Sequence, residues 1–227
     1  MEDLENVTIP ARFNGPPGSA NGGYACGVFA RLLGGRVEVT LRTPPPLDVP
    51  LAVRRSPDGL RVEDGETLVA EAEPVELDLE VPVPVSVEEA ADASRGYAGF
   101  AAHAYATCFV CGPARADGLG IYPGRVAGRD LVAAPWSPPD DVPDEVVWAA
   151  LDCPSGWAID EFSREGVLLG RLAVRILAPV TGGARYVVLG WPLGADGRKR
   201  HAGSAVLTAE RETCALARST WLVPRAD

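Results

Sequence analysis

One carboxylate stands alone in a segment whose composition is that of a buried helix. Asp152 is the only charged residue in VVWAALDCPSGWAI (146–159). An ionised carboxylate on a buried helix costs several kcal/mol unless it is paired or protonated, so its surroundings must compensate it. Such a group can take a proton from water as a general base, or it can orient a substrate. We therefore regard Asp152 as the candidate catalytic carboxylate of the chain.

Two structural explanations for Asp152 stay open beside the catalytic one. Pro154 disfavours helical geometry at Cys153, so the helix can break there and Asp152 can cap the restart. Alternatively, Arg31 can cross over from another segment and neutralise the carboxylate. Each explanation predicts a different partner for Asp152.

Five cysteines are scattered along the chain, an odd number that does not suggest a disulfide framework. Cys108 and Cys111 form a single Cys-x-x-Cys, and a zinc site would need two more ligands at close spacing. The remaining candidates are isolated in the sequence: Cys153, Cys214, His103 and His201. The sequence therefore predicts no metal and no redox cofactor.

A repeated decapeptide indicates that the fold contains two similar units. GRVEVTLRTP (35–44) and GRLAVRILAP (170–179) share Gly, Arg, Val and Pro at matching positions. An apolar helix precedes each copy, over 24–33 and from 145 toward 162, and each copy begins a series of about four strand-like segments at hairpin spacing. The sequence predicts an α+β fold in which the two copies are corresponding strands.

The composition narrows the range of partners. The chain has 227 residues, 47% of them hydrophobic, which is enough for a sizeable core. Its net charge of −10 argues against nucleic acids and acidic membranes. No apolar stretch approaches the ~20 residues of a membrane span, and MEDLENVTIP (1–10) lacks the features of a signal peptide. We therefore expect a cytoplasmic protein with no nucleic-acid or membrane partner.

Two pairs of segments resemble the hot-dog-fold thioesterases. CFVCGPARADGLGIY (108–122) followed by VWAALDCPSGWA (147–158) is similar to the Cys-x-x-Cys-Gly-Pro segment and "LDEA-Gly-Trp-Ala" helix of many such proteins. NGGYACG (21–27) and RVEVTLRTPPPLDVPL (36–51) resemble the helix and following strand of acyl-CoA thioesterase-like proteins. The resemblance covers most of the chain and implies a double hot-dog, with two helices each wrapped by a curved antiparallel sheet.

The resemblance also suggests how the chain divides into units. Residues 1–84 would form the N-terminal hot-dog unit and residues 105–227 the C-terminal one. Residues 85–104 would link them, and Ser86 with Glu89 fits a capping box that starts a short helix there.

The catalytic parts that the resemblance implies are divided between the two halves. Asn21, Gly22 and Gly23 form the glycine-rich helix start of the family, where the N–H groups of Gly23 and Tyr24 would hold the thioester carbonyl and stabilise the oxyanion. The family's carboxylate position falls on Ala30 in this half. In the second half Asp152 occupies the carboxylate position, but the helix start reads Pro143-Asp144-Glu145. We therefore expect one composite site per chain.

The implied substrate is an acyl-CoA or another acyl thioester, hydrolysed by water that Asp152 activates. Four aromatic side chains are expected to wall the pocket, although core packing would also explain each of them: Tyr24, Phe29, Trp148 and Trp157. Arg198 and Arg200, in a predicted hairpin turn, would suit coenzyme A phosphates, although a solvated turn explains them as well.

Two rival functions share the same scaffold. The first is a non-catalytic acyl or acyl-CoA binding protein, which the divided motif favours. The second is a hydratase, which would need a histidine that neither predicted helix contains. We also expect chains to associate into a homo-oligomer through apolar strands such as RYVVLGWPL (185–193).

Overall fold

The two copies of the repeated decapeptide lie side by side at the centre of one antiparallel sheet. In the computed structural model, which describes residues 2–138, 140–162 and 167–224, β2 (Val37–Leu41) pairs with β8 (Leu168–Ile176). Glu38 lies opposite Ala173, the residue that matches it in the other decapeptide. A pseudo-twofold axis therefore passes between Glu38 and Ala173, and the prediction that the copies are corresponding strands is confirmed.

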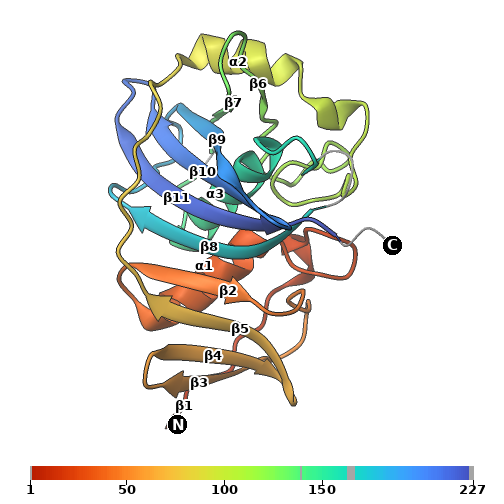
Figure 1. The fold of residues 1–227 in the computed structure, drawn as a ribbon, viewed down its shortest axis with the longest axis vertical. Coiled ribbons are helices and arrows are strands. Elements are labelled where there is room, and N and C mark those ends of the chain that lie inside the picture. Colours follow the sequence, from red (N-terminus) through yellow and green to blue (C-terminus); the bar gives the residue numbers. More distant parts are fainter. Residues whose placement is uncertain (1, 139, 163–166, 225–227) are drawn as a thin grey trace.

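The order of strands is the same when it is read outward from this centre in either direction (Figure 1). Toward one edge the sheet continues through β5 (Thr67–Pro74), β4 (Gly59–Asp64), β3 (Ala52–Ser56) and β1 (Glu2–Asp3). Toward the other it continues through β11 (Thr213–Leu222), β10 (Lys199–Thr208), β9 (Tyr186–Asp196), β7 (Val132–Trp136) and β6 (Gly124–Arg125). Each half therefore repeats the same succession of strands, and β6 is an additional strand at the edge of the second half.

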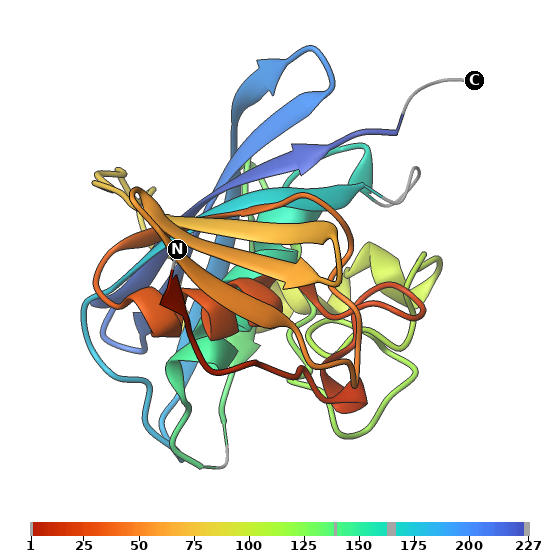
Figure 2. The same ribbon diagram turned by 90° about the horizontal axis from the view of Figure 1, so that it is seen from below.

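Two apolar helices lie within the curve of this sheet (Figure 2). α1 (Gly22–Leu33) begins at Asn21, whose side chain accepts a hydrogen bond from the Tyr24 N–H, and ends at Gly34, whose φ of 75° favours glycine. α3 (Asp144–Trp157) is the equivalent helix of the second half. No described helix is long and apolar enough to cross a membrane.

α1 and α3 approach so closely that two positions of α1 exclude a side chain. A Cβ atom on Gly23 would lie 2.5 Å from the Asp152 Cβ and 2.7 Å from the Trp148 carbonyl oxygen. A Cβ atom on Gly27, one turn later, would lie 2.7 Å from the Glu145 Cα. The start of α1 thus lies against the middle of α3, and the helices run antiparallel. The close approach of the two helices therefore depends on glycine at these two positions.

α3 continues through Pro154 instead of breaking at Cys153, so the predicted restart is wrong. The helix has buried residues as far as Trp157 and ends before the predicted Phe162. Next to the proline, the Ser204 hydroxyl donates to the Leu151 carbonyl at 2.6 Å and ties α3 to β10. Asp152 is therefore not a cap.

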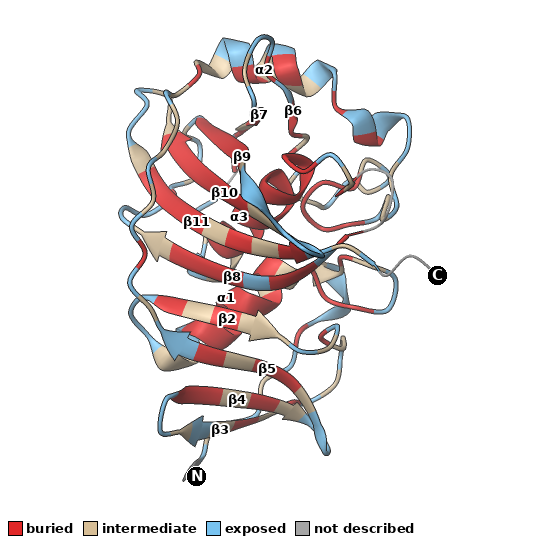
Figure 3. Cartoon of the chain, in the orientation of Figure 1, coloured by how far each residue is buried: buried red, intermediate tan, exposed pale blue. Residues whose placement is uncertain are grey.

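The segment predicted as a linker is packed against the second half of the sheet. α2 (Val87–Arg95) begins with the predicted capping box of Ser86 and Glu89. Its buried face, with Ala90, joins an apolar cluster on the outer side of this half, which Figure 3 shows in red beneath the helix. The short 3-10 helix η2 (Ala98–Phe100) follows, and another, η1 (Ala11–Phe13), precedes α1.

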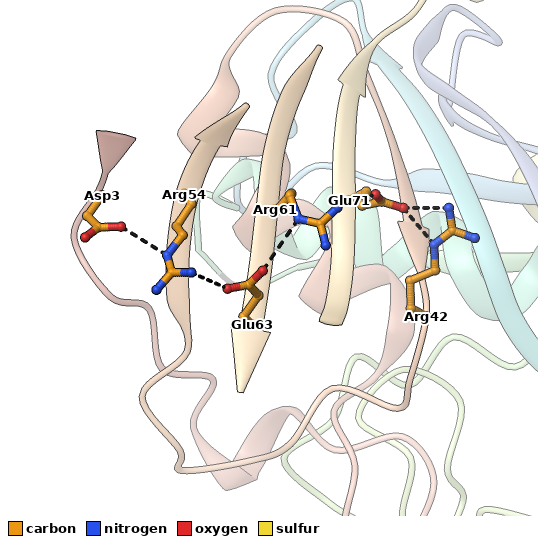
Figure 4. Close-up of polar contacts among 6 residues, drawn as sticks. All are labelled: Asp3, Arg42, Arg54, Arg61, Glu63 and Glu71. Atoms are coloured by element: carbon orange, nitrogen blue, oxygen red, sulfur yellow. Dashed lines mark hydrogen bonds and ion pairs between the residues drawn. The ribbon is translucent and has the colours of Figure 1, made fainter. Parts of the chain in front are cut away.

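The outer face of the first half carries charges instead of an apolar cover (Figure 4). Six side chains alternate in sign across the strands: Asp3, Arg54, Glu63, Arg61, Glu71 and Arg42. The Arg54 guanidinium lies 3.1 Å from the Asp3 carboxylate and 2.9 Å from that of Glu63, for example. This charged face is suited to water, so the two halves differ on their outer sides.

The close helix contact predicts that Gly27→Ala lowers the free energy of unfolding by about 1–3 kcal/mol, because the new methyl group must push α3 away. Alanine would otherwise favour a helix over glycine by about 1 kcal/mol, so the sign of the effect is diagnostic. Urea unfolding followed by circular dichroism measures it. Gly96→Ala is the control, since its Cβ would meet only the Ala93 carbonyl oxygen at 3.4 Å. Unchanged or higher stability in Gly27→Ala would contradict the packing described here.

Candidate active site

The structure brings the predicted helix start and the predicted carboxylate into direct contact. Asp152 Oδ2 accepts hydrogen bonds from the Gly23 N–H at 2.9 Å and from the Asn21 side-chain amide at 2.8 Å. Asn21 and Asp152 are each only 2% exposed. Residues 131 positions apart thus form one polar group at the interface of the two halves.

This arrangement corrects the predicted role of the helix N–H groups. The Gly23 N–H binds Asp152, and the Tyr24 N–H donates to the Asn21 Oδ1 at 2.9 Å, so neither is available to an oxyanion. The Asn21 N–H donates to the Phe13 carbonyl at 2.7 Å. Among the described residues, no acceptor is found for the Gly22 N–H, which has no partner within the helix either. Gly22 is therefore the available donor at this helix start.

Asp152 keeps one carboxylate oxygen without a hydrogen bond. No partner is found for its Oδ1 within the described part of the chain, although the atom is buried. Burial raises the pKa of Asp152 to about 7, while the hydrogen bond from the Gly23 N–H acts in the opposite direction. The group therefore has a free lone pair and a proton affinity suited to exchange with water near neutral pH.

Arg31 does not neutralise this carboxylate. Its guanidinium lies 2.8 Å from the Glu145 carboxylate, at the opposite end of the contact between α1 and α3. The second structural explanation for Asp152 is therefore wrong as well. The symmetry-related position to Asp152 is Ala30, so the reciprocal end has no carboxylate in that place.

A largely apolar cavity of about 780 Å³, including open solvent at its mouth, adjoins Asp152. Both halves line it, with Asn21 and Gly22 from the first and Asp152 from the second. Its apolar walls are formed by Leu41, Pro44, Pro45, Phe162, Val167, Leu169 and Trp221. A molecule bound in this cavity would therefore contact both halves of the chain.

The four aromatic residues predicted to wall the pocket do not line this cavity. Phe29 is fully buried in the core, and Trp148 packs against Gly27 of α1. Tyr24 stacks on Phe13, with ring centroids 3.7 Å apart. The fourth, Trp157, packs edge-on against Tyr97 and Phe162 instead. Core packing, the other explanation, accounts for them.

The two arginines of the predicted turn lie at the hairpin of β9 and β10. Arg200 forms an ion pair with Glu161, and the Arg198 Nε donates to the Val223 carbonyl at 2.9 Å. Val223 follows Leu222, which lines the cavity, so Arg198 lies near that wall. A contact of Arg198 or Arg200 with a phosphate stays a prediction.

A cluster of thiols that sequence spacing did not reveal lies beside Asp152. Cys108, Cys111 and Cys153 have their sulfur atoms within 4.8 Å of one another, and all three line the cavity. Hydrogen bonds from the Cys111 and Cys153 thiols lower the pKa of Cys108 well below its usual value. The nearest signal in the sequence was that the Cys-x-x-Cys segment and the Asp152 segment both carry the family resemblance.

Asp152→Asn is expected to keep the melting temperature at or above that of the unchanged chain at pH 8. An amide oxygen can accept the same bonds from Gly23 and Asn21, and the cost of a buried charge disappears. Asp152→Leu, which has a similar size, leaves these two donors unpaired and should cost about 1–3 kcal/mol of stability. Differential scanning calorimetry compares them. Equal stability of the Asn and Leu variants would show that the hydrogen bonds contribute nothing.

Comparison with known proteins supports the fold. No protein-family model and no curated protein sequence matches the chain. Among solved structures, a tesB protein from Mycobacterium avium subsp. paratuberculosis matches 96% of this chain and 91% of its own, with a TM-score of 0.59 and 13% identity. A hot dog fold protein from Alicyclobacillus acidocaldarius matches 98% of this chain and 93% of its own, with a TM-score of 0.67 and 11% identity.

A third solved structure is an acyl-CoA thioesterase II, TesB2, from Mycobacterium marinum. It matches over 92% of this chain and 91% of its own, with a TM-score of 0.58 and 11% identity. Identities this low establish the fold and leave the activity to be argued from the site. The chain therefore has the double hot-dog fold of the TesB-like thioesterase structures, over nearly its full length.

Proposed function

We propose that the chain hydrolyses an acyl thioester of the acyl-CoA type in this cavity, with Asp152 as the general base. The observation that carries the proposal is the state of the Asp152 carboxylate. One of its oxygens is fixed by Gly23 and Asn21, and the other is buried without a partner in the described structure. A carboxylate held in this way can orient one water molecule and take its proton as the water attacks the thioester carbon.

The Gly22 N–H supplies the polarising group that the mechanism needs. The attacking water gives its proton to Asp152 while its oxygen bonds to the carbonyl carbon, and negative charge develops on the carbonyl oxygen. The first N–H group of α1 and the positive end of the helix dipole stabilise that charge. Collapse of the intermediate breaks the carbon–sulfur bond, and the proton on Asp152 leaves with the thiolate.

The remaining walls suit the two ends of such a substrate. Apolar side chains such as Leu169 and Trp221 can cover an acyl chain, because water is displaced from hydrocarbon on both surfaces. The charged end of the substrate would point to the mouth, where Arg198 is the candidate contact for a phosphate. One site per chain follows, since Ala30 replaces the carboxylate at the related position.

The binding-protein alternative is also supported by a specific observation. Two of the N–H groups at the start of α1 are already occupied, one by Asp152 and one by Asn21. A protein that only binds an acyl chain does not need these N–H groups to stabilise an oxyanion, so their engagement agrees with a binding function. Kinetic data separate the two functions.

The first test is a screen of short, long and aromatic acyl-CoAs, with release of free coenzyme A as the readout. We expect hydrolysis, and in Asp152→Asn a fall in kcat of about 10²–10⁴-fold, because proton transfer from water is lost. Asp144→Asn makes the same chemical change at the exposed start of α3 and should leave kcat within about twofold of the unchanged chain, as expected of a group outside the site. Saturable binding without turnover across the screen would favour the binding protein.

A second test isolates the Gly22 N–H. Proline is well tolerated at the first position of a helix and has no N–H, and Asn21 already has the extended geometry that a following proline needs, with φ −58° and ψ 128°. Gly22→Pro should therefore lower kcat by about 10²–10³-fold with little change in melting temperature.

Gly22→Ala is the matched control. It keeps the N–H and places the same Cβ atom near Leu169, 2.8 Å from the nearest side-chain carbon. The comparison therefore subtracts the effect of crowding. If the alanine and proline variants lose activity equally, the oxyanion role of Gly22 is wrong.

A further inference from the structure

Three thiols from two distant segments meet at one point of the cavity wall. Cys108 and Cys111 belong to the loop that precedes β6, at the right of Figure 1, and Cys153 follows Asp152 on α3. The Cys108 Sγ lies 3.7 Å from the Cys153 Sγ. The sulfurs of a tetrahedral zinc site with bonds of about 2.3 Å lie roughly 3.8 Å apart, so this spacing is that of ligands around one ion.

We propose that Cys108, Cys111 and Cys153 bind one zinc ion as thiolates and leave its fourth coordination position open to the cavity. Thiolates select soft or borderline ions, and Zn²⁺ prefers four ligands in tetrahedral geometry. Binding displaces three thiol protons to the solvent. All three side chains line the cavity, which puts the open position where a water molecule or a ligand can reach it.

Surrounding N–H groups are placed to support the thiolates. The backbone N–H groups of Val110 and Cys111 lower the pKa of Cys108. The Asn21 amide nitrogen lies 3.9 Å from both the Cys108 and the Cys153 sulfur. Donors directed at sulfur offset the negative charge that three thiolates bring to one divalent ion.

Glycine at position 112 makes this loop possible. A Cβ atom there would lie 2.4 Å from the Cys108 backbone nitrogen and 2.6 Å from the Ala106 carbonyl oxygen. The sharp return of the chain brings both cysteines of the Cys-x-x-Cys to the same side. The loop is therefore shaped to present two ligands at once.

His103 supports the cluster but is not its fourth ligand. Its Nε2 lies 3.3 Å from the Cys111 Sγ, and its Nδ1 accepts a hydrogen bond from the Tyr105 N–H at 2.9 Å. An Nδ1 that accepts carries no proton, so the neutral ring has its proton on Nε2 and donates it to the sulfur. This tautomer leaves three protein ligands and one open position.

The test uses the full chain, reduced and freed of metal, and titrated with Co²⁺ as a spectroscopic substitute for zinc. We expect a sulfur-to-cobalt charge-transfer band that saturates at one ion per chain. The band should be lost in the single serine variants Cys108→Ser, Cys111→Ser and Cys153→Ser. It should persist in Cys214→Ser, a buried cysteine outside the cluster, and in His103→Gln.

Two further measurements keep the test independent of folding defects. Native mass spectrometry of the unchanged chain should show one bound zinc ion. Zn²⁺ should raise the melting temperature of the unchanged chain and of Cys214→Ser, but not that of Cys153→Ser, whose cooperative melting without metal shows that it folds.

Three results would overturn the proposal. The first is the absence of a charge-transfer band in the unchanged, reduced chain. The second is a Cys108–Cys153 disulfide as the main form of chain purified without reductant. Loss of the band in His103→Gln would mean a closed site with four protein ligands and would refute the open position. None of these readouts depends on hydrolysis, so the metal site and the proposed activity can fail separately.

Discussion

The contact between α1 and α3 is the constraint on which the rest of the molecule depends. Glycine at positions 23 and 27 lets the two backbones approach until the start of one helix touches the middle of the other. Because the two helices lie this close together, the Asp152 carboxylate can accept hydrogen bonds from the Gly23 N–H and the Asn21 amide. The helix contact also lies beside the junction of the two halves of the sheet, because α1 precedes β2 and α3 precedes β8 along the chain. Any side chain at position 23 would push away both the Asp152 carboxylate and the backbone of α3.

The same contact gathers several reactive groups in a small volume. Asp152 and Cys153 are neighbours on α3, while Asn21 hydrogen-bonds the first and faces the sulfur of the second. Burial raises the pKa of Asp152, whereas at Cys108 hydrogen bonds from the Cys111 and Cys153 thiols outweigh the effect of burial and lower the pKa. A buried carboxyl group and a cluster of three thiols therefore share one wall of the cavity.

Local sequence signals predicted the fold well, and they predicted the site only in part. Both helices, the capping box at Ser86 and the symmetric strands follow from periodicity and turn residues that act over a few positions. Asp152 could be chosen because a single charge in an apolar helix needs a partner. The identity of that partner depends on a contact across 129 positions, which no local pattern encodes. For the same reason the thiol cluster was missed, since Cys153 is far from Cys108 in the chain.

The symmetric pairing of β2 and β8 also has a consequence for how such a molecule can evolve. In a dimer of identical chains, every substitution appears on both sides of the axis, and both sites gain or lose together. Here Glu38 and Ala173 occupy related positions, yet Glu38 reaches two arginines at the surface, whereas Ala173 is buried in the apolar cluster of the second half. In a single chain that contains both halves, each half can be substituted without the same change in the other. The second half can therefore keep a carboxylate while the first half keeps a glycine-rich helix start, and a substitution in one half leaves the other half unchanged.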